Sequence, residues 1–239
     1  HFLLTNEQVG WIGGAAMWGF TVTILTFGSL CDVVGMRLVL RLAVVGHLCG
    51  AFLMIFADGF AMLFAGALTL SMADGLVQAA CNPLIATLFA DRKTEMFNKF
   101  HLWFPGGIVM GGLIAFGLDW LSIDSWQLKL ALILAPAMTY GALFLGQKFP
   151  ATERVQSGVS FGTMFKETLF RPLFLVLLVS MMMTASIELG PNRWIPAVLK
   201  SAGIPGILVL VWISLVMAVL RYFAGSVGRR VSPTGILLS

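Results

Sequence analysis

Charged side chains are scarce in this chain of 239 residues, where Asp, Glu, Lys and Arg together make up 11% against 59% hydrophobic residues. Soluble domains carry about 25% charged and roughly 45–50% apolar residues. So few charges do not cover a water-soluble fold of this size, and the mean hydropathy of +0.93 agrees. We therefore predict an all-α polytopic membrane protein with the lipid bilayer as its main partner.

The sequence also lacks the groupings that enzyme chemistry needs. It shows no paired carboxylates, no cluster with metal-ligand spacing and no nucleophile beside a base. Its three cysteines lie in or at the ends of apolar segments, where we interpret them as packing residues. We expect no catalytic residue, no bound metal, no cofactor and no nucleic-acid partner, and thus no enzyme.

Long apolar stretches dominate what is present, and a membrane span needs about 20 such residues. Seven stretches qualify, at residues 9–30, 38–57, 60–89, 100–118, 128–145, 172–189 and 204–224. An eighth begins at Gly235 and stops at Ser239. Since the first residue is His1 and not Met, both ends predict a fragment of a longer protein.

Positive charge is distributed unevenly along the chain. Twelve of the fifteen Lys and Arg residues, Arg37 among them, fall on one alternate set of loops and helix ends, leaving Lys129, Arg193 and Lys200 on the other. Because cytoplasmic loops carry the excess of Lys and Arg, we predict that Arg37 is cytoplasmic and that His1 lies outside.

One short segment between the first two spans has an unusual composition. Residues 28–37 read GSLCDVVGMR, with glycines at Gly28 and Gly35 and opposite charges at Asp32 and Arg37. A short turn between spans needs only polarity, not this spacing. The segment resembles the loop signature G-x-L-x-D-x-x-G-x-R/K of the major facilitator superfamily. The resemblance implies a secondary active transporter that works by alternating access.

In that family the signature follows helix two, so the spans here would be helices two to eight. The resemblance then implies three parts: an N-terminal bundle over residues 1–145 without helix one, a cytoplasmic linker over 146–171, and the start of the C-terminal bundle over 172–239. Residues 225–235 read GSVGRRVSPTG, a degenerate echo of the first signature that fits a repeat in the second half.

The resemblance also implies a gate formed by Gly28, Asp32, Gly35 and Arg37. In the family this loop holds the cytoplasmic side closed while the outer side is open. We expect Gly28 to let helices approach closely, Asp32 to accept hydrogen bonds near the start of a facing helix, and Arg37 to pair with acidic side chains. The alternative is an ordinary cytoplasmic turn with a helix-capping aspartate.

A column of polar residues crosses the third span. Asp74, Gln78 and Asn82 recur every four residues, so they share one face of a helix. Such groups are costly inside a membrane unless they face water or a polar partner. Amides and carboxylates there suit a ligand rich in hydroxyl groups. The alternative is a network of hydrogen bonds between helices that only holds the bundle together.

Two stretches resemble one branch of that superfamily. Residues 74–83 (DGLVQAACNP) and 98–107 (NKFHLWFPGG) look like the fucose:proton symporter and its bacterial sugar-transporter relatives. This implies a monomer in a bacterial inner membrane that binds a small, sugar-like solute together with protons. Trp103 is a candidate to stack on the sugar. The relatives carry a glutamate where Gln78 stands, so the candidates for proton coupling are Asp74, one turn away, or an acidic residue on the missing first helix.

Two alternatives remain at this stage. An exporter or drug antiporter of the same superfamily would share the spans and the loop signature. A seven-helix receptor or retinal protein would share the topology, but residues 204–224 contain no lysine for a Schiff base. Glu188 and Arg193 are expected to end the sixth span at its outer side, as a solvated loop or part of an outer gate, and they are near enough in sequence to pair.

Overall fold

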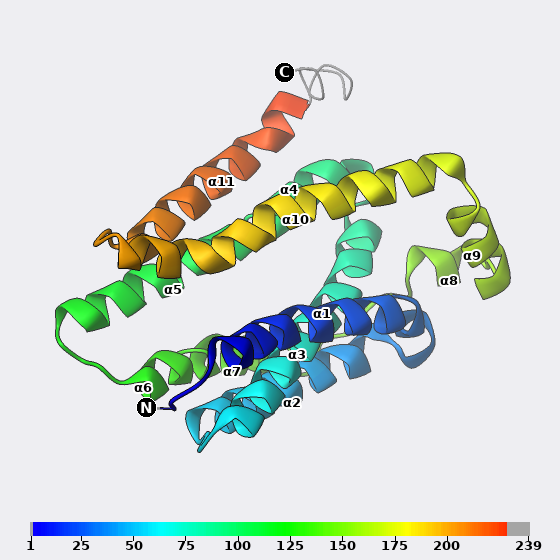
Figure 1. The fold of residues 1–239 in the computed structure, drawn as a ribbon. Coiled ribbons are helices and arrows are strands. Elements are labelled where there is room, and N and C mark those ends of the chain that lie inside the picture. The colour runs from blue at the N-terminus through cyan, green and yellow to red at the C-terminus, as the bar shows by residue number, and fades with distance from the viewer. Residues whose placement is uncertain (1, 229–239) are drawn as a thin grey trace. The chain divides into compact units, whose positions relative to one another are not determined.

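The computed structural model describes residues 2–228, apart from the side chains of residue 193 and residues 225–228. The described chain is helical and contains no strand. Seven of its helical segments are long and apolar enough to cross a membrane, which confirms the predicted fold class (Figure 1). The expected eighth span and most of the echo at residues 225–235 lie outside the described residues.

The first three spans are continuous helices: α1 (Asn6–Val34), α2 (Met36–Ile55) and α3 (Phe60–Leu88). Helix α1 starts at a capping box in which Thr5 and Gln8 exchange side-chain and backbone hydrogen bonds. Helices α1 and α2 are separated by Gly35 alone. The signature at residues 28–37 is therefore mostly helical. Its turn is much tighter than the connection expected between a span that ends at residue 30 and one that begins at residue 38.

The remaining spans are interrupted or extended. The fourth combines the 3-10 turn η1 (Ala90–Arg92) with α4 (Lys93–His101) and α5 (Trp103–Trp120), and the fifth combines α6 (Trp126–Ala131) with α7 (Leu134–Phe144). The long connection carries α8 (Glu153–Gln156) and α9 (Phe161–Leu169). Helices α10 (Pro172–Ser201) and α11 (Gly206–Gly228) follow.

Helix α10 corrects one expectation. The sixth span was predicted to end near Leu189, because Gly190 and Pro191 are common where helices stop. The helix instead continues through Pro191 and Pro196 to Ser201. Prolines are tolerated in membrane helices because neighbouring groups satisfy the freed backbone atoms. Glu188 therefore lies within a helix, not in an outer loop.

Contacts divide the chain into two units. Unit 1 contains residues 1–90 and 125–157, and unit 2 contains residues 91–124 and 158–239. Within unit 2, α5 and α11 lie side by side, and an added Cβ at Gly112 would stand 2.6 Å from the Val211 side chain. The bundle boundaries expected at residues 145 and 172 remain predictions.

Helices α1 and α3 pack closely in unit 1 (Figure 1). The Ser71 hydroxyl accepts from the Phe20 backbone N–H at 2.7 Å and donates to the Ala16 carbonyl at 2.6 Å. Glycines allow this approach: a Cβ on Gly75 would stand 2.8 Å from the Phe20 carbonyl oxygen and 2.9 Å from Thr23 Cβ. Small residues at helix contacts are typical of membrane bundles.

Substituting Gly75 by valine is therefore expected to destabilise unit 1. The new side chain must displace the α1 backbone, and overpacking of this kind costs about 1–3 kcal/mol. Thermal unfolding of the full-length protein in detergent should show a lower midpoint by several degrees. Gly13→Val is the control, because an added Cβ there meets no atom within 4 Å; equal midpoints for the two variants would contradict the packing described.

Candidate functional site

Three polar side chains from three helices meet in unit 1. Nε2 of His47, on α2, lies 3.0 Å from Oδ1 of Asp74, on α3. Nδ1 of the same ring lies 2.7 Å from the Tyr140 hydroxyl, on α7, and 3.0 Å from the Ala43 carbonyl oxygen. The rings of His47 and Tyr140 meet edge to face, with centroids 5.8 Å apart. His47 is thus held from both nitrogens.

The partners of His47 can form hydrogen bonds with two protonation states of its ring. A carbonyl and a carboxylate only accept hydrogen bonds, whereas a tyrosine hydroxyl both donates and accepts. A doubly protonated His47 donates to Asp74 and, on its other side, to Ala43 or Tyr140. When the ring loses the Nδ1 proton, the Tyr140 hydroxyl can turn and donate to Nδ1. The cluster therefore has a hydrogen-bonded arrangement for two protonation states.

The cluster lies deep in the spans. Asp74 is fourteen residues from each end of α3, counting from 60 to 74 and from 74 to 88. The His47 side chain is 12% exposed in the structure, whereas that of Asp74 is 66% exposed. A carboxylate at this depth is strongly disfavoured against lipid tails. Its open side therefore needs a water-filled cavity or another polar partner.

The predicted polar column lies on one helix, as expected. Asp74, Gln78 and Asn82 are all part of α3, which runs through Pro83 without ending. Gln78 and Asn82 are partly buried. The Asn82 side-chain oxygen is buried and has no hydrogen-bond partner among the described residues. An unpaired buried acceptor costs about 1–3 kcal/mol, so this atom is suited to accept a hydrogen bond from a group outside the described residues.

Trp103 belongs to unit 2, at the first position of α5, and its side chain is exposed. The polar column belongs to unit 1, so the role expected of Trp103, which is in unit 2, stays a prediction. In the same unit, the Arg221 guanidinium lies 3.8 Å from the Glu188 carboxylate, and it also donates to the His101 carbonyl at 3.5 Å. The expected partner of Glu188 was Arg193, whose side chain lies outside the described part of the chain.

Within the signature segment, Asp32 has two side-chain hydrogen-bond partners and little exposure. Its carboxylate accepts hydrogen bonds from the Thr152 hydroxyl and from Nε of Arg154. Thr152 caps the short helix α8, and its own hydroxyl accepts from the Val155 N–H. The side chains of Asp32 and Arg154 are 8% and 18% exposed. The segment after α7 is thereby fastened to the end of α1.

The other three residues of the signature have different environments. Gly35 adopts φ +82°, a conformation that favours glycine, and its N–H bonds the Cys31 carbonyl at 2.9 Å. Arg37 donates to the Gln147 carbonyl at 2.7 Å instead of pairing with an acidic side chain as expected. An added Cβ on Gly28 meets no atom within 4 Å, so the described part of the chain contains no close helix approach there.

Sequence reasoning missed His47 and Tyr140. The available signal was a histidine in the middle of an apolar span, where an ionisable residue indicates function by default. The tyrosine carried a weaker signal, as one of two in the chain. Nothing in the sequence shows that residues 93 positions apart meet.

Comparison with known proteins agrees with this architecture. The family model of the Major Facilitator Superfamily matches residues 1–239. No curated protein and no solved structure matches the chain significantly. A match over the whole chain, with seven apolar helical spans, defines an integral membrane transporter. The chain belongs to the Major Facilitator Superfamily.

Proposed function

We propose that the chain is part of a proton-coupled symporter for a small polyhydroxylated solute, most simply a sugar, in a bacterial inner membrane. The transporter would act as a monomer, by alternating access. The observation that carries this proposal is the cluster of His47, Asp74 and Tyr140 at mid-depth in unit 1. It supplies the titratable group that Gln78, unlike a glutamate, does not.

Proton coupling requires a site that gains and releases a proton and whose protonation changes the affinity for the solute. The His47–Asp74 pair is the candidate for this site, because both groups are ionisable and the ring is hydrogen-bonded on each nitrogen. The Asp74 side chain is 66% exposed, which leaves it accessible to solute or water. Loss of the proton changes the charge at that face and thereby the affinity for the solute.

The solute class rests on the same helix. Gln78 and Asn82 lie one and two turns beyond Asp74, and the Asn82 oxygen is an acceptor without a partner among the described residues. One solute hydroxyl can donate to that oxygen and another to the Asp74 carboxylate. A solute with several hydroxyls suits this column better than an apolar drug, which would leave the Asn82 oxygen without a donor.

Asp32 and its partners would act as the inner gate. The carboxylate is little exposed and is bonded to both Thr152 and Arg154, so releasing it needs a concerted change in α1 and the segment after α7. A buried ion pair that must break between two states gives a two-state latch. Gly35 and Arg37 position the same turn.

Uptake of radiolabelled hexoses by the full-length protein in right-side-out vesicles tests the proposal. We expect saturable uptake that an inward proton gradient drives to accumulation. The absence of saturable uptake would contradict the sugar class, and uptake that ignores the gradient would indicate a uniporter. Uptake of drugs into inverted vesicles, driven by the proton gradient, corresponds to export from the cell and would favour the exporter.

A further inference from the structure

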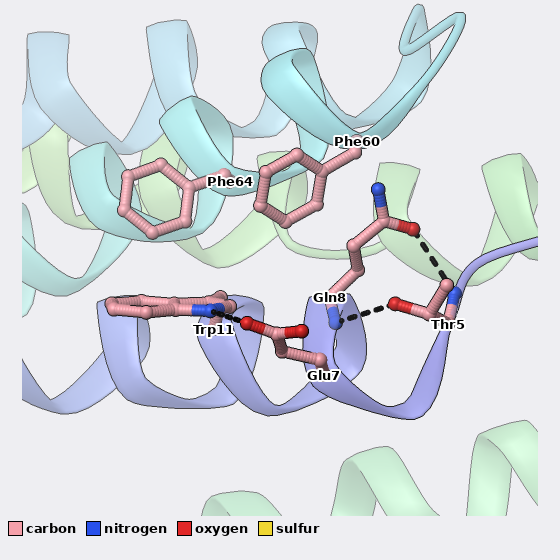
Figure 2. Close-up of a pocket in the computed structure, with 6 residues that line it drawn as sticks. All are labelled: Thr5, Glu7, Gln8, Trp11, Phe60 and Phe64. Atoms are coloured by element: carbon pink, nitrogen blue, oxygen red, sulfur yellow. Dashed lines mark hydrogen bonds between the residues drawn. The ribbon is translucent and has the colours of Figure 1, made fainter.

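A cavity in unit 1 is not used by the proposed mechanism. It has a volume of about 470 Å³ and lies between the start of α1 and the start of α3 (Figure 2). Its lining consists of Thr5, Glu7, Gln8, Trp11, Phe60 and Phe64. The volume falls within the range of about 300–1,000 Å³ that is typical of ligand pockets. The charge distribution places this end of the helices on the outer side.

Aromatic rings form two opposite walls of the cavity. Figure 2 shows the Trp11 ring, from α1, across from the Phe60 and Phe64 rings of α3. Trp11 is held in place, since its Nε1–H donates to Glu7 at 3.3 Å and its ring meets Trp18 edge to face at 5.5 Å. Fixed rings of this kind offer flat apolar surface at little cost in side-chain entropy.

Two polar side chains stand beside these rings with hydrogen-bonding capacity to spare. Oε1 of Glu7 accepts from Trp11, which leaves Oε2 as a charged acceptor. Oε1 of Gln8 accepts from the Thr5 N–H at 3.0 Å, which orients the amide and leaves its NH₂ group to donate. A carboxylate acceptor and an amide donor, carried by consecutive residues of α1, therefore both line the cavity.

We propose that this cavity is an outer capture site for a pyranose ring. The apolar face of the ring stacks on Trp11, one hydroxyl donates to Glu7, and another hydroxyl accepts from the Gln8 amide. A ring that carries several hydroxyls can use both the acceptor and the donor that line the cavity, whereas an organic cation would bring its charge against the amide hydrogens of Gln8. The inference rests on the proposed function and adds a first binding step to it.

Saturation-transfer NMR tests this site without requiring transport. The full-length protein in nanodiscs is mixed with D-glucose, D-galactose or D-mannose, and saturation is transferred from the aromatic protons to the sugar. We expect transfer to the protons on one face of the sugar, with the greater part lost in Trp11→Leu. Glu7→Gln, which preserves size, should weaken the apparent affinity about tenfold, the effect of one charge-assisted hydrogen bond.

Trp120→Leu is the matched control, because Trp120 is exposed on α5 of the other unit. Transfer to the hexoses that is equal in wild type and both variants, or absent in wild type, would overturn the capture site. Trp11-dependent transfer to tetramethylammonium in place of the hexoses would also overturn it. Proton-driven uptake of hexose by wild type in vesicles would leave the proposed function standing in each of these cases.

Discussion

Asp74→Asn and His47→Gln are each expected to abolish solute accumulation driven by the proton gradient. Both variants should still exchange solute and carry it down its own concentration gradient. Each substitution preserves the size of the side chain and removes one ionisable member of the cluster. A gradient of about 100 mV is worth about 2.3 kcal/mol per charge, enough for roughly 50-fold accumulation. The accumulation ratio should therefore fall to about one. Uptake and counterflow of labelled hexose in vesicles measure the two activities separately.

Asp58→Asn is the control for this pair of variants, because Asp58 is an exposed acid in the turn between α2 and α3. It should accumulate solute like wild type. Tyr140→Phe removes the hydroxyl that can turn toward Nδ1 and keeps both ionisable groups, so it should slow accumulation without removing it. Full accumulation by Asp74→Asn or by His47→Gln would exclude the cluster as the proton site.

Breaking the Asp32–Arg154 contact is expected to reduce uptake at least tenfold. Removing one partner of a buried pair costs about 3–5 kcal/mol, since the other charge is left buried and unpaired. Asp32→Asn and Arg154→Gln should both show the loss. The double variant should be no worse than the worse single variant, because all three variants break one and the same contact. Initial rates of uptake at equal expression measure the effect.

An exposed ion pair in the long connection between α7 and α10 provides the control. Arg171 and Glu167 lie 2.9 Å apart, and their side chains are 70% and 59% exposed. An exposed pair of this kind contributes about 0–1 kcal/mol. Glu167→Gln is thus expected to transport normally, and additive losses at Asp32 and Arg154 would argue against a shared latch.

Most of the fold follows from the sequence, because an apolar run of sufficient length must form a helix in a membrane. This rule located the seven spans found among the described residues. It did not locate the helix ends, because the residues at each end determine where a helix stops. Gly35 is sufficient to turn the chain, so α1 and α2 extend beyond the apolar stretches. Pro191 does not end α10, since a proline removes one hydrogen bond but does not bring water to that depth.

The site was predicted in part, and the missing part has a physical cause. The spacing of Asp74, Gln78 and Asn82 depends only on helix periodicity, which the sequence displays. The partners of Asp74 depend on which faces of α2 and α7 turn toward α3, and packing determines that. The same limit applies to Asp32, whose motif predicted a hydrogen-bonded carboxylate but not Thr152 and Arg154 as the donors.

Proton movement on addition of solute tests the central proposal most directly. De-energised right-side-out vesicles containing the full-length protein are given an excess of the transported hexose, and the external pH is recorded. Coupled symport predicts a transient alkalinisation of the medium in wild type and in Asp58→Asn, and none in Asp74→Asn, which still performs counterflow. Hexose uptake by wild type with no change in external pH would contradict the account.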